Sequence, residues 1–167
     1  MRLEKGALPR GLGSGRKDEQ ERMSRRVTMI TSHLENSHDH DPYAHDLKGL
    51  ATFTLNLAHD KASQSRVLAQ SLASKATDPK LKERYATCAE HYDDAVDDIE
   101  DGKNYLGKGD YNSVNTMASA AMTEAGDCLD SFMQPPKDPS ALSDNGKAVE
   151  DICSIILVIG NLLLGRA

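Results

Sequence analysis

Residues 80–109 read KLKERYATCAEHYDDAVDDIEDGKNYLGKG and carry two patterns at once. Apolar side chains recur at intervals of three, four or seven, which predicts a helix with one buried stripe. The stripe consists of Leu81, Tyr85, Cys88, Tyr92, Ala95 or Val96, Ile99 and Leu106. The other side carries eight carboxylates between Glu83 and Asp101, and such a surface suits a basic partner.

The flanking segments predict three more long helices, over residues 44–76, 110–133 and 145–164. Asp78 and Pro79 suit the cap and first turn of the acidic helix, and Gly109 suits the left-handed residue that ends it. The last helix is apolar on most sides and is expected to be the most buried. The expected seam of the first helix is Leu47, Leu50, Thr54, Leu57, Ala62 in place of Lys61, Ser65, Leu68 and Leu72. The expected seam of the third is Val114, Met117 or Ala118, Ala121, Ala125, Cys128 and Phe132.

Composition agrees with packed helices. The 167 residues suit one domain, and with 4% aromatic residues and no Trp the core must consist mainly of aliphatic side chains. Short turns between four long helices predict an all-α, up-down-up-down four-helix bundle.

The charge divides the chain. Residues 1–26 hold eight basic and four acidic residues and so carry a charge of +4. The net charge of the whole chain is −6, so the remainder carries −10. We expect three parts: a flexible basic tail (1–26), an atypical N-terminal segment (27–44) and the bundle domain (45–165). The acidic body disfavours nucleic acid and anionic membranes as partners. No signal peptide is visible, and the apolar run 152–164 is too short to span a bilayer.

Three cysteines, Cys88, Cys128 and Cys153, cannot form a zinc site of the CxxC type. Composition leaves two interpretations open: three reduced core thiols, or one disulfide with one free thiol in a secreted protein. In an antiparallel pair of helices a bond between Cys88 and Cys128 is geometrically reasonable. It would close a loop of about 40 residues and stabilise by about 4 kcal/mol in the chain-entropy model.

Motifs for catalysis are not found: no GxSxG, HExxH, Walker loop or GxGxxG occurs, so we expect no enzyme and no cofactor. Glu35 and His38 match one copy of a di-metal Glu-x-x-His motif, but such sites need two copies and further carboxylates. A solvated loop is the preferred interpretation, and no metal is predicted.

Several segments, in one order over about residues 45–165, resemble the plant invertase/pectin methylesterase inhibitor family. They are DLKGL (46–50), ATDPKLK (76–82), YDDAVD (92–97), GDYNS (109–113), ASAA (118–121) and LVIGNLL (157–163). The resemblance implies a four-helix bundle, a Cys88–Cys128 disulfide and a free Cys153. It also implies a stoichiometric complex with a cell-wall enzyme and secretion to the apoplast. Family members begin with a disulfide-linked helical hairpin that packs on the bundle or swaps onto a second protomer. Because no cysteine precedes Cys88, we expect that hairpin to be altered or missing, and a monomer, with a domain-swapped dimer as the alternative.

Which enzyme the protein inhibits is indicated by a motif that distinguishes the two groups of the family. Invertase inhibitors carry Pro-Lys-Phe after a Gly-Asp between the second and third helices, whereas Gly109 and Asp110 here precede Tyr-Asn-Ser. This favours pectin methylesterase as the partner, with the bundle covering its polysaccharide cleft. An invertase inhibitor, or a bundle like the pro-region of a pectin methylesterase, is the alternative. That the chain ends just after the bundle favours a free inhibitor over a pro-region.

The expected contact surface lies on the second and third helices. Carboxylates there could pair with Lys or Arg on the enzyme, and Tyr and Asn supply adaptable contacts. The candidate residues are Glu90, His91, Tyr92, Asp94, Asp97, Tyr111, Asn112, Asn115, Ser119, Asp127 and Asp130. For each acid taken singly, the alternative is an ordinary solvated helix surface.

Overall fold

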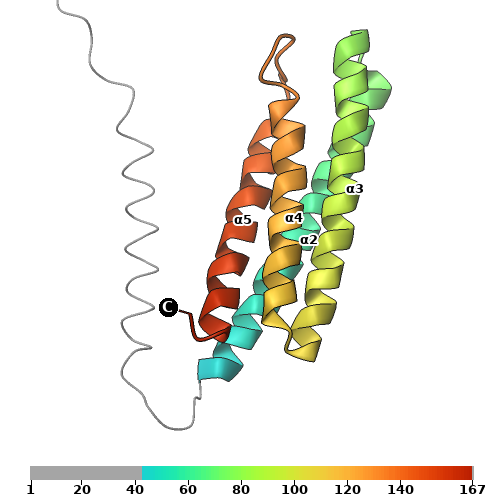
Figure 1. The fold of residues 1–167 in the computed structure, drawn as a ribbon. Coiled ribbons are helices and arrows are strands. Elements are labelled where there is room, and N and C mark those ends of the chain that lie inside the picture. The colour runs from blue at the N-terminus through green and yellow to red at the C-terminus, as the bar shows by residue number, and fades with distance from the viewer. Residues whose placement is uncertain (1–42, 167) are drawn as a thin grey trace, which may run out of the picture. The chain divides into compact units, whose positions relative to one another are not determined.

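The computed structural model describes residues 43–166, which form four helices and no strand (Figure 1). The helices are α2 (Tyr43–Lys75), α3 (Pro79–Lys108), α4 (Tyr111–Asp130) and α5 (Leu142–Leu163). Each packs against the next, and α5 packs against α2, so the four close into one bundle. This confirms the predicted up-down-up-down architecture. None of these helices is long and apolar enough to cross a membrane.

The boundaries of α3 follow the predicted caps. The Asp78 carboxylate accepts hydrogen bonds from the backbone N–H of Lys80 at 2.8 Å and Leu81 at 3.0 Å. Gly109, at φ 73°, ends the helix in the left-handed region, where a residue with a Cβ would be strained. The chain then turns directly into α4, with Asp110 as its cap. This short connection makes α3 and α4 antiparallel neighbours.

The loop between α4 and α5 begins and ends three residues earlier than predicted. Helix α4 ends at Asp130 rather than 133, because the backbone N–H groups of Phe132 and Met133 donate to the carbonyls three residues back, at 3.1 and 3.0 Å, and form a tight turn in place of a further helical turn. Helix α5 begins at Leu142 rather than 145, because Asp138 and Ser140 accept hydrogen bonds from the first backbone N–H groups. The N-cap residue of α5 itself, Ala141, makes no side-chain cap hydrogen bond, so the contacts of Asp138 and Ser140 come from the preceding loop, and helical spacing did not reveal them.

The core stripes of α3 and α4 are those predicted, except that Leu81 is only half-buried and that Phe132, although buried, follows the end of α4. On α3, Ala95 rather than Val96 is fully buried, and on α4 Ala118 rather than Met117. The buried residues of both helices fall on one face with helical spacing. They are Tyr85, Cys88, Ala89, Tyr92, Ala95, Ile99, Gly102 and Leu106 on α3, and Val114, Ala118, Ala121, Ala125 and Cys128 on α4.

The prediction for α2 is wrong at two positions. Leu50 and Leu57 are 43% and 45% exposed, while Leu55 is buried. The side facing the bundle is built mainly from alanines, and Cδ2 of Leu55 lies 3.3 Å from where a Cβ on Gly102 of α3 would stand. Small residues on both helices allow close packing, so the bulkier leucines are placed on the flank.

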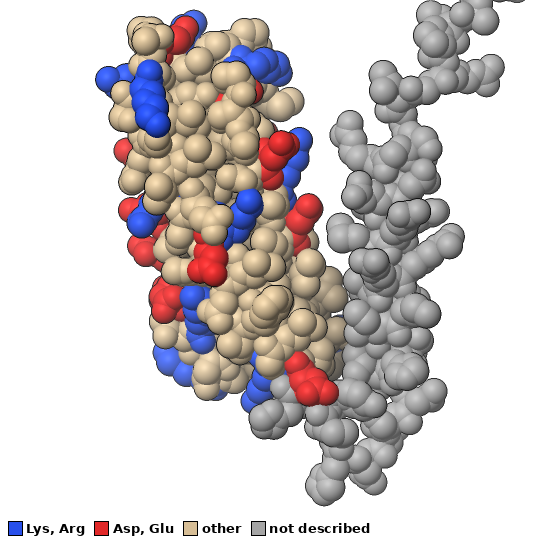
Figure 2. Space-filling view, turned by 180° about the vertical axis from the view of Figure 1, so that it is seen from behind, with Lys and Arg blue, Asp and Glu red and all other residues tan. Residues whose placement is uncertain are grey.

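Buried residues make up a larger share of α5 than of the other three helices, which agrees with the expectation that it is the most buried, although Ile155 and Val158 are exposed. The view from behind, on the side where α2 lies, shows acidic and basic side chains mixed with broad uncharged areas (Figure 2). Helix α5 packs mainly against α2 and α4, and these two helices do not cover all of its apolar residues.

The disulfide between Cys88 and Cys128 joins α3 to α4, with the Cα atoms 4.8 Å apart, and confirms the expected pairing. Cys153 is a free, buried thiol. Burial, and to a lesser extent the charges of Asp98 and Glu150, raise its pKa to about 12, so it stays protonated and unreactive.

At Gly146, α5 packs closely against side chains of α3 and α4. A Cβ here would lie 2.8 Å from Cδ2 of Leu129 and 2.8 Å from the Tyr92 hydroxyl oxygen, both side chains packed in the bundle. We expect Gly146→Ala to lower the free energy of unfolding by about 1–3 kcal/mol through overpacking, measured by urea denaturation.

Gly107→Ala is the matched control, since it also replaces a helical glycine but nothing lies within 4 Å of the added Cβ. It should be neutral or gain up to about 1 kcal/mol from helix propensity. Equal effects of the two substitutions would contradict the steric explanation.

The predictions for the tail (1–26), nearly all of the segment 27–44, the altered hairpin and the Glu35/His38 pair fall outside the described residues.

Candidate functional site

The outer side of α3 presents a row of exposed carboxylates. Glu90, Asp94, Asp97 and Asp101 follow one another at steps of four, three and four residues, so they lie on one face. Among the described residues none of the four forms an ion pair, whereas Asp93 beside them pairs with Arg66 of α2. The row is therefore available to positive groups of another molecule.

The electrostatics of this row are visible in Asp98, which lies between it and α4. Burial raises the pKa of Asp98, and the negative charges of Glu124, Asp94, Asp101 and Asp97 raise it further. The acidic neighbours of Asp98 therefore add to the effect of burial on its pKa, which indicates an excess of negative charge around this carboxyl group. A cationic partner would relieve part of this repulsion.

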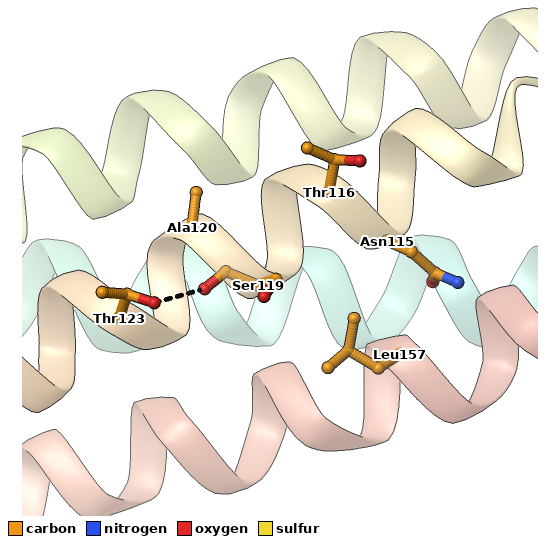
Figure 3. A pocket seen from close by; sticks show the side chains of 6 residues that line it. All are labelled: Asn115, Thr116, Ser119, Ala120, Thr123 and Leu157. Atoms are coloured by element: carbon orange, nitrogen blue, oxygen red, sulfur yellow. Dashed lines mark hydrogen bonds between the residues drawn. The ribbon is translucent and has the colours of Figure 1, made fainter.

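The neighbouring part of α4 is uncharged and built from small side chains. Residues 111–123 contain no charged side chain. An open hollow of about 500 Å³ runs along this part of α4 and the edge of α5 (Figure 3). Its lining residues are Asn115, Thr116, Ser119, Ala120, Thr123 and Leu157. Small polar side chains let the backbone of a partner come close while offering hydrogen bonds.

Sequence reasoning named only Asn115 and Ser119 of this hollow. Thr116 and Thr123 stand one turn before and after Ser119 on α4, so helical spacing could have identified them. Leu157 comes from α5, and no sequence signal connects it with the hollow. Asn115 is held toward α5 by a hydrogen bond from its Nδ2 to Oδ1 of Asn161 at 2.9 Å.

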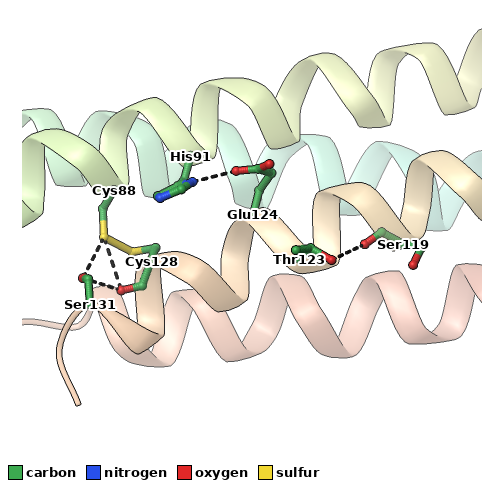
Figure 4. A network of polar contacts seen from close by, with 7 residues as sticks. All are labelled: Cys88, His91, Ser119, Thr123, Glu124, Cys128 and Ser131. Atoms are coloured by element: carbon green, nitrogen blue, oxygen red, sulfur yellow. Dashed lines mark hydrogen bonds and ion pairs between the residues drawn. A yellow bond between two sulfur atoms is a disulfide. The ribbon is translucent and has the colours of Figure 1, made fainter.

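A polar network links α3 and α4 beside the disulfide (Figure 4). Nδ1 of His91 and Oε2 of Glu124 are 2.6 Å apart, and both side chains are about one-quarter exposed. Asp127, one helical turn after Glu124, is exposed next to them. The structure therefore brings His91 and Asp127 together, and adds Glu124, which the sequence analysis did not select.

Not every predicted contact residue belongs to this surface. Tyr92 is fully buried in the core, so its selection as a contact residue is wrong. Tyr92 is one of the apolar-stripe residues that α3 turns toward the core, and its hydroxyl group lies near Gly146 inside the bundle. Asp130 lines a separate groove with Lys147 and Glu150 of α5. Tyr111 is half-buried, with the Lys48 ammonium 5.8 Å from its ring centre.

The remaining predicted residues are at least partly accessible on α3 and α4, and together they are called the α3–α4 face below. These residues are Glu90, His91, Asp94, Asp97, Asn112, Asn115, Ser119 and Asp127. The α3–α4 face combines free carboxylates with small uncharged groups on rigid helices. Such a surface can bind another molecule by charge pairing and hydrogen bonds.

Fold and surface together define a class of protein: a disulfide-linked four-helix bundle with an acidic helical face. The profile of the plant invertase/pectin methylesterase inhibitor family matches residues 27–159, and the chain belongs to this family. The family and the relatives below are inhibitors rather than enzymes.

Particular relatives are close in sequence and in fold. The chain is 50% identical over 120 residues to the pectinesterase inhibitor of Actinidia deliciosa, covering 72% of this chain and 65% of the relative. It is 36% identical over 118 residues to pectinesterase inhibitor 2 of Arabidopsis thaliana, covering 71% of this chain and 68% of the relative. The crystal structure of a pectin methylesterase inhibitor from Arabidopsis thaliana superposes with a TM-score of 0.67 at 30% identity, over 77% of this chain and 80% of that one. The chain thus spans just under two thirds of the Actinidia relative.

Proposed function

We propose that the protein inhibits a plant pectin methylesterase by forming a stoichiometric complex in which the α3–α4 face lies across the pectin-binding cleft. The observation that carries the proposal is the 50% identity to the pectinesterase inhibitor of Actinidia deliciosa. Inhibition here is occlusion: the bundle covers the cleft and takes no part in bond making or breaking.

The charge of the α3–α4 face supports this mode of binding. Glu90, Asp94 and Asp97 have no ion-pair partners within the described part of the chain, so they can pair with Lys or Arg on an enzyme without breaking internal contacts. Complementary charge speeds encounter and fixes orientation.

The shape of the α3–α4 face supports it as well. The hollow along α4 is lined by short side chains, so few rotamers have to be ordered when a partner binds. Both helices are held together by the Cys88–Cys128 bond, which keeps the two parts of the face in a constant relative position. A rigid surface loses less entropy on binding than a mobile one.

An inhibitor of invertase is the second candidate, since the family includes both kinds. In this chain the α3–α4 turn runs from Gly109 and Asp110 directly into Tyr111, and Asp110 is occupied in capping α4. The Pro-Lys-Phe motif expected of invertase inhibitors at this turn is replaced by Tyr-Asn-Ser. This observation favours the esterase.

Titration of both enzymes tests the proposal. Plant pectin methylesterase activity should fall linearly with added protein until one equivalent is present, while acid invertase activity stays constant. Absence of any effect on the esterase at micromolar excess would overturn the proposed function. Loss of invertase activity alone would establish the second candidate.

We also propose the apoplast as the place of action, because the cell wall holds the esterified pectin that such an enzyme processes. A buried disulfide agrees with an oxidising compartment.

A further inference from the structure

We propose that His91, Glu124 and Asp127 form a site for a divalent ion of the zinc type, bound between α3 and α4. One donor atom from each side chain lies within 4.8 Å of the other two: a ring nitrogen of His91 and a carboxylate oxygen of Glu124 and of Asp127. One imidazole and two carboxylates are ligands that zinc accepts, with water in the fourth position.

The geometry requires only small movements. Zinc ligands at about 2.0–2.1 Å in a tetrahedron stand about 3.3 Å from each other. Nδ1 of His91 and Oε2 of Glu124, now 2.6 Å apart, would separate slightly to admit the ion. Asp127 is exposed and can rotate toward them without disturbing the core. Each step leaves the helices in place.

The scaffold suits such a site because it is rigid at this point. His91 lies three residues after Cys88 on α3, and Asp127 directly precedes Cys128 on α4, so the disulfide holds the two helices close by. Glu124 and Asp127 are one helical turn apart and face the same way. Figure 4 shows His91 and Glu124 pointing toward one another across the two helices.

The charge balance also favours a dication. Neutral His91 with two carboxylates carries −2, which one zinc ion would neutralise. Helix α4 contains no Lys or Arg that could take the place of the ion.

Isothermal titration calorimetry with zinc chloride at neutral pH tests the site. The full chain is used with the other histidines of its N-terminal part replaced (H33N, H38N, H40N and H45N), because those could bind zinc on their own. This protein should bind one zinc ion. His91→Asn, Glu124→Gln and Asp127→Asn should each weaken binding by at least about tenfold, as losses at metal sites commonly do.

His59→Asn is the matched control. His59 also has two carboxylates near it, with 3.8 Å to Asp60 and 3.9 Å to Glu100, but it belongs to α2 and faces α3. It should leave zinc binding unchanged, and circular dichroism should show the same helix content in all variants. Zinc should raise the melting temperature of the parent protein and not that of His91→Asn.

Calcium separates a built site from a general attraction of cations to acidic residues. It prefers oxygen ligands, so it should bind weakly and independently of His91. Zinc binding that survives His91→Asn unchanged, or calcium binding as tight as zinc, would overturn the proposal. Neither readout involves the esterase, so this result and the proposed function stand or fall separately.

Discussion

Replacing Cys88 and Cys128 together by alanine should lower the free energy of unfolding by about 4 kcal/mol. The bond joins residues 40 apart, and in the chain-entropy model its removal frees a loop of that length in the unfolded state. Both side chains are buried, so lost packing adds to the effect. A domain of this size is stable by about 5–15 kcal/mol, so the loss is a large share of the total.

Urea denaturation followed by circular dichroism measures this loss, and the melting temperature should fall by about 8–16 °C. Cys153→Ala is the control because it removes a buried thiol and keeps the disulfide. It should cost distinctly less than the double variant. A double variant as stable as Cys153→Ala would show that the disulfide does not restrain the unfolded chain. Thiol counting in denaturant should find one free thiol in the unmodified protein.

Reversing the charge of Asp94 and Asp97 to Lys should weaken the complex with pectin methylesterase by at least about 30-fold, or about 2 kcal/mol. Both carboxylates are exposed and have no ion-pair partner among residues 43–166, so both can pair with cationic side chains of the enzyme. Lysine at these positions would meet the enzyme's cations with like charge. The inhibition constant, determined from residual esterase activity, is the measurement.

Asp60→Lys with Asp151→Lys makes the same change in net charge on α2 and α5, where both residues are exposed. This control should alter the inhibition constant far less, since it changes only the long-range field. Equal weakening by the two double variants would mean that net charge alone drives association. Unchanged inhibition by the Asp94/Asp97 variant, with helix content intact, would place the interface elsewhere on the bundle.

The acids of the proposed contact surface could be identified from the sequence because they follow helical spacing along α3. Asp94 and Asp97 lie on the side opposite Cys88 and Ile99 in any helix built from this stretch. Tyr92 was misplaced because a tyrosine suits both a core and a contact surface, although its spacing from Cys88 and Ile99 places it in the buried stripe. Leu50 and Leu57 were misplaced because the alanines of α2 pack more closely on α3 than leucines could.

The sequence by itself determined the four helices and the caps of α3, because these depend on residues within a turn or two of each other, and the order of several segments along the chain identified the family. Asp78 and Gly109 act through neighbouring backbone groups, so their roles are evident from the chain. Only the tertiary structure decided that Glu124 and Asp127 meet His91, and that Leu157 joins the hollow on α4. Such meetings depend on the rotation and register of one helix against another, which side-chain packing sets across the whole bundle.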